Sequence, residues 1–167
     1  QDSSLQMLMS SGQRLVRFIS NLLDVAKLKA GKLAYFMGEV NAGEAVSVVL
    51  ELYAPVARAK KIAFTQQVAQ DLSPVHADRE KLEQILNNLV SNAMKFTSPQ
   101  GGIVVAAGPD ADPGFVRFSV FNSGAGINPQ DLPKLFKSFE QLDAARQKKQ
   151  GIVGTGLGLA LCKTLAE

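Results

Sequence analysis

The sequence predicts a layered α/β sandwich, of the α+β class, in which helices cover one face of a mixed sheet and one long bundle-type helix comes first. Residues 3–30 place apolar side chains at alternating spacings of three and four, which is the period of a helix with a continuous apolar stripe. Helical and alternating strand patterns are then interspersed without strict βαβ alternation. We therefore expect a mixed sheet behind the helix.

The N-terminal helix is predicted to belong to a helical bundle. Its stripe consists of Leu5, Leu8, Leu15, Ile19, Leu22 and Ala26, with Gly12 as a weak core position. Flanking positions such as Val16 and Leu23 are apolar too, whereas a two-stranded coiled coil would carry charges there. The helix therefore needs more than one neighbour, and Gly31 is expected to end it.

The remaining elements follow from capping residues, periodicity and turn residues. Asn41, with Glu44 three residues later, is expected to cap one helix, and Asp78 the helix that carries Leu86 and Ala93 on its buried face. Pro55 is expected to bend the first of these helices. In chain order we expect a strand at 33–36, a helix to about residue 60, a strand at 62–68, a turn at 71–74, a helix at 79–96, strands at 103–107 and 115–121, a short helix near 129–136, and a final glycine-led helix.

Composition narrows the function. The 167 residues suit one compact domain plus an extra element, and the net charge of +3, without a basic run among aromatics, gives no reason to expect nucleic acid. The single Cys162 has no partner for a disulfide or a zinc site, which favours a reducing, cytoplasmic setting. No apolar run is long enough to span a bilayer, so no membrane contact is expected from this segment.

The helix predicted at 79–96 carries a polar stripe of Asn88, Asn92 and Lys95. Spacings of four and three place these side chains on one edge, away from the apolar face. Amide oxygens suit Mg²⁺, which is often shared with substrate phosphates, and a lysine one turn on can meet phosphate as a point charge. A merely solvated polar face would look the same.

Two glycine-containing segments are further candidates. Residues 122–127 follow an apolar strand, and their glycines would let the backbone approach a flat ring while Asn122 accepts a hydrogen bond from an exocyclic amine. Residues 154–159 precede an apolar helix, where successive backbone N–H groups can cradle phosphate. The second segment is neither a Rossmann fingerprint nor a P-loop. Each segment alone could be an ordinary turn or helix entry.

The order of these segments is more specific than any one of them. An Asn-bearing helix, a strand ending in Asn-x-Gly-x-Gly, the pair Phe136 and Phe139, and a Gly-x-Gly-Leu-Gly-Leu turn occur at domain-scale separations. Together they resemble the N, G1, F and G2 boxes of sensor histidine kinases, the kinase branch of the Bergerat-fold ATPases that include gyrase and heat-shock chaperone ATPases. Residues 15–31 resemble the second helix of that family's dimerisation and phosphotransfer hairpin.

The resemblance implies two domains. Residues 1–32 would be the second hairpin helix, without the first, and residues 33–167 an ATP-binding catalytic domain of the Bergerat fold that continues past the C-terminus with further strands. The activity implied is that of a protein-histidine kinase, which moves the γ-phosphoryl group of ATP to a hairpin histidine and then to an aspartate of a response regulator receiver domain. A homodimer through the N-terminal helix, and a cytoplasmic domain whose parent can be membrane-anchored, are also implied.

The resemblance also assigns residue roles. Asn92 would coordinate Mg²⁺ at the ATP phosphates, and Asn88 and Lys95 would contact phosphate or its hydration shell during catalysis. Residues 137–153 resemble the ATP lid, with Arg146, Lys148 and Lys149 available for phosphate or simply solvated. The remaining nucleotide-binding positions would be Asn122, Gly124, Gly126, Ile127, Phe136, Phe139, Gly154, Thr155, Gly156, Leu157 and Gly158.

Three positions bear on the kind of activity. Asn88 stands where hydrolytic relatives usually have a glutamate base, which favours phosphoryl transfer over hydrolysis. Asn122 stands where aspartate is usual, and a neutral acceptor is expected to lower ATP affinity by about fivefold. The only histidine, His76, lies outside any acceptor context and is expected to be a structural or surface residue.

Two other functions remain open from the sequence. Asn122 and the missing acceptor histidine are compatible with a pseudokinase, a nucleotide sensor or scaffold without transfer activity. A hydrolytic Bergerat ATPase is the third reading. The Asn88, Asn92 and Lys95 stripe and the glycine-rich turn favour the kinase.

Overall fold

The computed structural model describes residues 12, 15–16, 19–20, 22–24, 26–27, 30–137, 140 and 156–167. The chain divides into two compact units. One is Tyr35–Leu132, and the other combines Gln1–Ala34 with Pro133–Glu167.

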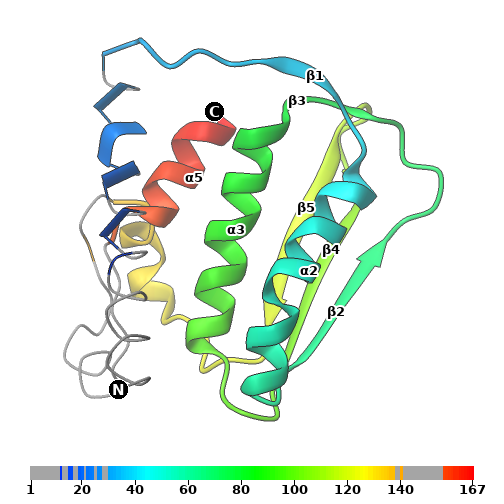
Figure 1. The fold of residues 1–167 in the computed structure, drawn as a ribbon, viewed down its shortest axis with the longest axis vertical. Coiled ribbons are helices and arrows are strands. Elements are labelled where there is room, and N and C mark those ends of the chain that lie inside the picture. Colours follow the sequence, from blue (N-terminus) through cyan, green and yellow to red (C-terminus); the bar gives the residue numbers. More distant parts are fainter. Residues whose placement is uncertain are drawn as a thin grey trace. The chain divides into compact units, whose positions relative to one another are not determined.

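The unit Tyr35–Leu132 is an α/β structure with a mixed sheet, which confirms the predicted fold class (Figure 1). Strand β2 runs parallel to β4, and β4 is antiparallel to β5, while β1 and β3 form a separate antiparallel pair. Its elements are β1 (Met37–Val40), α2 (Ala42–Ala59), β2 (Ala63–Val68), β3 (Val75–Asp78), α3 (Arg79–Phe96), β4 (Gly102–Pro109) and β5 (Val116–Asn122). The 3₁₀ helix η1 (Pro129–Lys134) follows β5.

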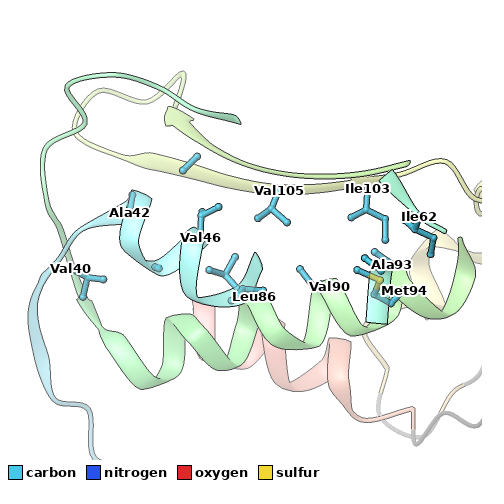
Figure 2. Close-up of a cluster of buried hydrophobic side chains, with 14 residues drawn as sticks. Val40, Ala42, Val46, Ile62, Leu86, Val90, Ala93, Met94, Ile103 and Val105 are labelled. Carbon is cyan, nitrogen blue, oxygen red and sulfur yellow. The ribbon is translucent and has the colours of Figure 1, made fainter. Parts of the chain in front are cut away.

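The core lies between the mixed sheet and helices α2 and α3. Burial alternates along β4, where Ile103, Val105 and Ala107 are buried and the residues between them are partly exposed. Figure 2 shows Ile103 and Val105 on the side of the sheet that faces the buried side chains of the two helices, including Leu86 and Val90 of α3. The helices therefore cover one face of the sheet. The apolar side chains on that face are removed from water by contact with the helices.

Helices α2 and α3 run parallel, since their N-terminal ends contact each other and so do their C-terminal ends. At their starts, Arg79 Nη2 lies 3.3 Å from Glu44 Oε2. At their ends, Lys60 Nζ donates to the carbonyl of Met94 at 2.8 Å. This carbonyl lies near the C-terminal end of α3, which is the negative end of the helix dipole, so the positive charge of the lysine is favourable there.

Both predicted helix caps are confirmed. The Asn41 side chain accepts from the backbone N–H of Glu44, and Asp78 Oδ1 accepts from the backbone N–H of Lys81, both at 3.1 Å. Asp78 also does something that the sequence does not reveal. Its Oδ2 accepts from the backbone N–H of Phe36 at 2.8 Å, so one buried carboxylate both starts α3 and holds the segment that leads into β1.

The strand predicted at 33–36 is wrong, since β1 begins at Met37. It pairs with β3, at Val75–Asp78, which the sequence analysis missed. Both strands have four residues, too few for a clear alternating pattern, and their pairing joins segments almost forty positions apart. Helix α2 continues through Pro55, and the predicted short helix near 129–136 is the 3₁₀ helix η1.

In the other unit, the described residues between 12 and 27 are helical, as predicted. This helix ends at Gly31, whose φ of +62° favours glycine, and the N–H of Lys32 reaches back to the carbonyl of Lys27 at 2.9 Å. Leu15, Val16 and other apolar side chains of the helix are exposed, as expected of a helix that needs further neighbours. None of the helices in the described part of the chain has the length and apolar character to cross a membrane.

Helix α5 (Gly158–Ala166) also lies in this unit and confirms the predicted final helix. Its residues Ala160, Leu161 and Cys162 are buried. Cys162, the single cysteine of the chain, is thus enclosed by the fold.

The double use of Asp78 gives a stability prediction. Burial of its carboxylate acts to raise the pKa, but backbone N–H groups, led by that of Phe36, and the charge of Lys81 outweigh this effect and hold the pKa below its ordinary value of 3.8. Asp78→Ala should lower the free energy of unfolding by about 2 kcal/mol, as measured by urea denaturation at neutral pH. Asp112→Ala, on an exposed loop, is the control and should change it little.

The pH dependence of the same stabilisation has a definite sign. Because the fold favours the ionised carboxylate, its contribution is complete above the ordinary pKa and is lost as the pH falls from about 4 through the lower folded value. Asp78→Asn should weaken this dependence. An unchanged acid unfolding curve in that variant would contradict the role given to the carboxylate.

Candidate functional site

The polar stripe of α3 lies opposite its buried face. Leu86, Val90, Ala93 and Met94 are the buried residues of this helix, and the helical period places Asn88, Asn92 and Lys95 on the other side. All three side chains are only partly exposed. They therefore do not form a fully solvated face, and Lys95 has a partner within the chain.

One side-chain atom of this stripe is buried without a partner. Among the described residues, Asn88 Nδ2 has no hydrogen-bond acceptor, and Oδ1 of the adjacent Asn87 has no hydrogen-bond donor. A buried N–H that stays unpaired costs about 1–3 kcal/mol, so such atoms are rare unless a ligand or water completes them. An amide N–H can donate to a phosphate oxygen or to a water bound to phosphate.

The turn after β5 meets the C-terminal end of α3. Asn122 Nδ2 donates to Thr97 Oγ1 at 3.3 Å, and the Thr97 hydroxyl donates to the carbonyl of Ala93 at 2.7 Å. Ser123 forms two hydrogen bonds with the backbone of Gly102. The Ser123 N–H donates to the Gly102 carbonyl at 2.9 Å, and the Ser123 Oγ accepts from the Gly102 N–H at 2.8 Å. These contacts bring Asn122 of the predicted adenine site next to the helix that carries the polar stripe.

The two glycines of the turn have different reasons to be glycine. A Cβ at Gly124 would lie 2.6 Å from Asn122 Nδ2 and 2.8 Å from the carbonyl oxygen of Phe96, too close for any side chain. Gly126 has open space around it but a φ of +72°, which side chains disfavour. The backbone of residues 124–126 therefore follows a path that other residues would strain.

Thr97 and Ser123 join the candidate site in the structure, although the sequence did not predict them there. Thr97 directly follows the polar stripe and Ser123 directly follows Asn122, so adjacency was the only available signal. Neither residue type is distinctive at the end of a helix or strand. Their importance comes from contacts between segments about 20 residues apart or more.

The other predicted site residues divide into three groups. Ile127 lies in the same unit as α3 and is 49% exposed, so its apolar side chain is available to a ligand. Phe136, Gly156, Leu157 and Gly158 belong to the other unit, where Gly156 has a φ of +69° and Gly158 begins α5. Phe139, Gly154 and Thr155, with Arg146, Lys148 and Lys149 of the predicted lid, lie outside the described residues. The phosphate cradle at 154–158 therefore stays a prediction.

Two other observations complete the chemistry of the described part. His76 is exposed on β3 opposite Glu39, as expected of a surface residue. Within the residues that the structure describes, no group of three or more His, Cys, Asp or Glu side chains is placed to hold a metal ion.

The chain is similar to known proteins along most of its length. Residues 77–167 match the family described as histidine kinase-, DNA gyrase B-, and HSP90-like ATPase. The circadian input-output histidine kinase CikA of Synechococcus elongatus is 35% identical over 159 residues, which are 94% of this chain and 21% of that protein. This chain thus spans about a fifth of that relative's length.

Solved structures give the same picture. Full-length ShkA in complex with AMPPNP is 34% identical with a TM-score of 0.82, and the match covers 99% of this chain and 33% of that one. Histidine kinase ThkA, in complex with the response regulator protein TrrA, is 26% identical with a TM-score of 0.63, over 81% of this chain and 41% of that one. Both matches confirm the predicted fold.

The crowding at Gly124 leads to a test of the turn. Gly124→Ala should lower the free energy of unfolding by about 1–3 kcal/mol, because the carbonyl of Phe96 cannot move away without shifting the end of α3. Thermal unfolding followed by circular dichroism measures the effect. Gly108→Ala on β4, where a Cβ meets nothing within 4 Å, is the matched control and should be neutral or slightly stabilising. Equal effects in both variants would contradict the tight packing of the turn.

Proposed function

We propose that this chain, which belongs to the histidine kinase-, DNA gyrase B-, and HSP90-like ATPase family, moves the γ-phosphoryl group of ATP to a histidine on a helical hairpin. It is the ATP-binding catalytic domain of a sensor histidine kinase. A histidine kinase is similar to it over 94% of its length, and a structure solved with AMPPNP covers 99% of it. The observation that carries the proposal is the half-buried amide stripe of α3, with its unpaired Asn88 Nδ2, next to the Asn122 turn.

At the base end, Asn122 Oδ1 would accept a hydrogen bond from the amino group of adenine. Gly126 leaves the backbone of the turn open to close approach, because nothing lies where its side chain would be, and Gly124 would line the pocket with its backbone. Ile127 would supply apolar contact to the ring. Phe136 and Phe139 are proposed to add aromatic contacts, as the resemblance implies.

At the phosphate end, Asn88 would donate its unpaired N–H to a phosphate oxygen or to its hydration shell. Lys95 would add positive charge there, and Asn92 would offer its amide oxygen to Mg²⁺. Mg²⁺ held by Asn92 would supply positive charge against the negative charge that develops during transfer. A neutral amide oxygen suits this ion because phosphates and water supply the remaining ligands. The turn at 154–158 is proposed to bind the phosphates through backbone N–H groups.

The reaction consists of two transfers. In the first, a nitrogen of the acceptor imidazole attacks the γ-phosphorus, the bond to the β–γ bridging oxygen breaks, and ADP leaves. In the second, an aspartate oxygen of a receiver domain takes the phosphoryl group and the histidine is restored. Asn88 cannot accept a proton from water as a glutamate base does, so the site favours transfer over hydrolysis.

The larger assembly forms part of the proposal. We assign residues 1–32 to the second hairpin helix and residues 33–167 to the catalytic domain. Exposed apolar residues along this N-terminal helix, such as Leu15 and Ile19, support a homodimeric bundle. The complex of ThkA with a response regulator supports a receiver domain as the partner. A cytoplasmic location follows from the need for ATP.

The first test is nucleotide binding. The chain should bind AMPPNP in a magnesium-dependent way, and Asn92→Ala should weaken binding by about tenfold or more because an amide ligand is lost. Calorimetry with Mg²⁺ and with EDTA measures both effects. Gln67→Ala removes an exposed amide from β2 and is the control that should bind as the wild type does. No binding to the wild type at millimolar nucleotide would refute the proposal.

The second test is phosphoryl transfer. With Mg-ATP alone, the chain should gain no acid-labile phosphate, whereas a separately supplied hairpin that carries an acceptor histidine should become labelled. Labelling should disappear when that histidine is replaced by glutamine. His76→Gln should change nothing, since His76 lies exposed on β3. A signal in the chain alone that depends on His76 would overturn this assignment of the acceptor.

A further inference from the structure

Thr97 has a single hydroxyl proton, which it donates in a hydrogen bond within α3. The side chain is buried, with 5% of its surface exposed, at the residue that ends α3. Its Oγ1 lies 2.7 Å from the carbonyl oxygen of Ala93, four residues back, and donates to it. A carbonyl oxygen can only accept, so the proton points along this bond.

Because this proton is used, Thr97 can only accept a hydrogen bond from Asn122. With its proton used, Thr97 Oγ1 presents lone pairs to the amide 3.3 Å away, and only the NH₂ end of that amide can donate to them. The Oδ1 end must then point away from Thr97. No described residue donates to this Oδ1, so its acceptor capacity is left for a ligand.

We propose that Thr97 is a positioning residue that fixes the amide of Asn122 with its oxygen toward the base, and so makes the site select a purine with an amino group at position 6. This inference rests on the proposed function, because it assumes that Asn122 faces the base of a nucleotide. An amide is nearly symmetric in shape, and it can accept or donate depending on which end points outward. The structure supplies the element that chooses between the two ends.

The choice matters because the competing purines have opposite chemistry at this position. Adenine has an amino group that donates, whereas hypoxanthine, the base of inosine triphosphate, has a carbonyl oxygen that accepts. With Oδ1 outward, Asn122 pairs with adenine and meets the inosine carbonyl with a second acceptor. If the amide were free to turn over, it could present its NH₂ end and accommodate inosine.

The identity of residue 122 fits this role. An aspartate there would present an acceptor oxygen to Thr97 Oγ1, and the hydroxyl would have to turn away from the Ala93 carbonyl to donate to it. An asparagine lets both bonds form at once. Thr97 and Asn122 are therefore a matched pair of hydrogen-bonding groups.

The test compares the dissociation constants of ATP and inosine triphosphate for the full chain with Mg²⁺, by calorimetry. Thr97→Val keeps the branched shape of the side chain and removes the hydroxyl, so the preference for ATP should fall by about three- to tenfold. Thr97→Ser retains the hydroxyl and should keep the preference within about twofold. A merely structural role would weaken binding of both nucleotides in parallel and leave their ratio unchanged.

The outcomes are separable. A wild type that binds neither nucleotide overturns the proposed function and this inference with it. A wild type that binds ATP, with an unchanged ratio in Thr97→Val or an equal loss in Thr97→Ser, overturns the inference alone. Should the valine variant fail to fold, Thr97→Ala removes the same hydroxyl, and its ratio decides. In an Asn122→Ala background, Thr97→Val should no longer alter the ratio, because the amide that it orients is gone.

Discussion

The packing of α3 against the mixed sheet is the constraint on which the rest of the site depends. Leu86, Val90 and Ala93 are buried with Val105 and other residues of β4 in one core. The helical period is fixed, so burial of this face determines where every other side chain of α3 points. The amide stripe faces away from the sheet for this reason. A rotation of the helix that buried the stripe would leave several polar groups without partners at a large cost.

The two ends of α3 are fixed by buried polar side chains that each form hydrogen bonds with two partners. Asp78 accepts at the first turn and also holds Phe36, while Thr97 bonds back to Ala93 at the last turn and receives Asn122. Between these ends the pattern is different, since Asn88 Nδ2 is buried and unpaired. The helix is thus held firmly at its ends by internal hydrogen bonds and keeps an unused donor in the middle. This distribution suits a binding surface, because the ligand completes what the fold leaves open.

Neutral amides characterise the proposed site. Asn88, Asn92 and Asn122 bring oxygen acceptors and N–H donors without a negative charge that would repel phosphate. The disadvantage of an amide is that its two ends must be told apart, which a carboxylate does not require. The hydroxyl of Thr97 provides that distinction for Asn122, and the crowded backbone at Gly124 keeps the turn close to it. At the base end of the site, a neutral amide of fixed orientation thereby does what a charged carboxylate would otherwise do.

The sequence by itself determined the helices, their caps and the amide stripe, because these depend on neighbours within a few positions along the chain. Asn41, Asp78 and the span Arg79–Phe96 are examples. The alternating pattern also located β2, β4 and β5 to within about two residues. Only the tertiary structure decided that β1 pairs with β3, that Asp78 holds Phe36, and that Thr97 meets Asn122. Each of these contacts joins positions at least 25 residues apart, and no local period or propensity encodes which distant partner a backbone group or a hydroxyl will find.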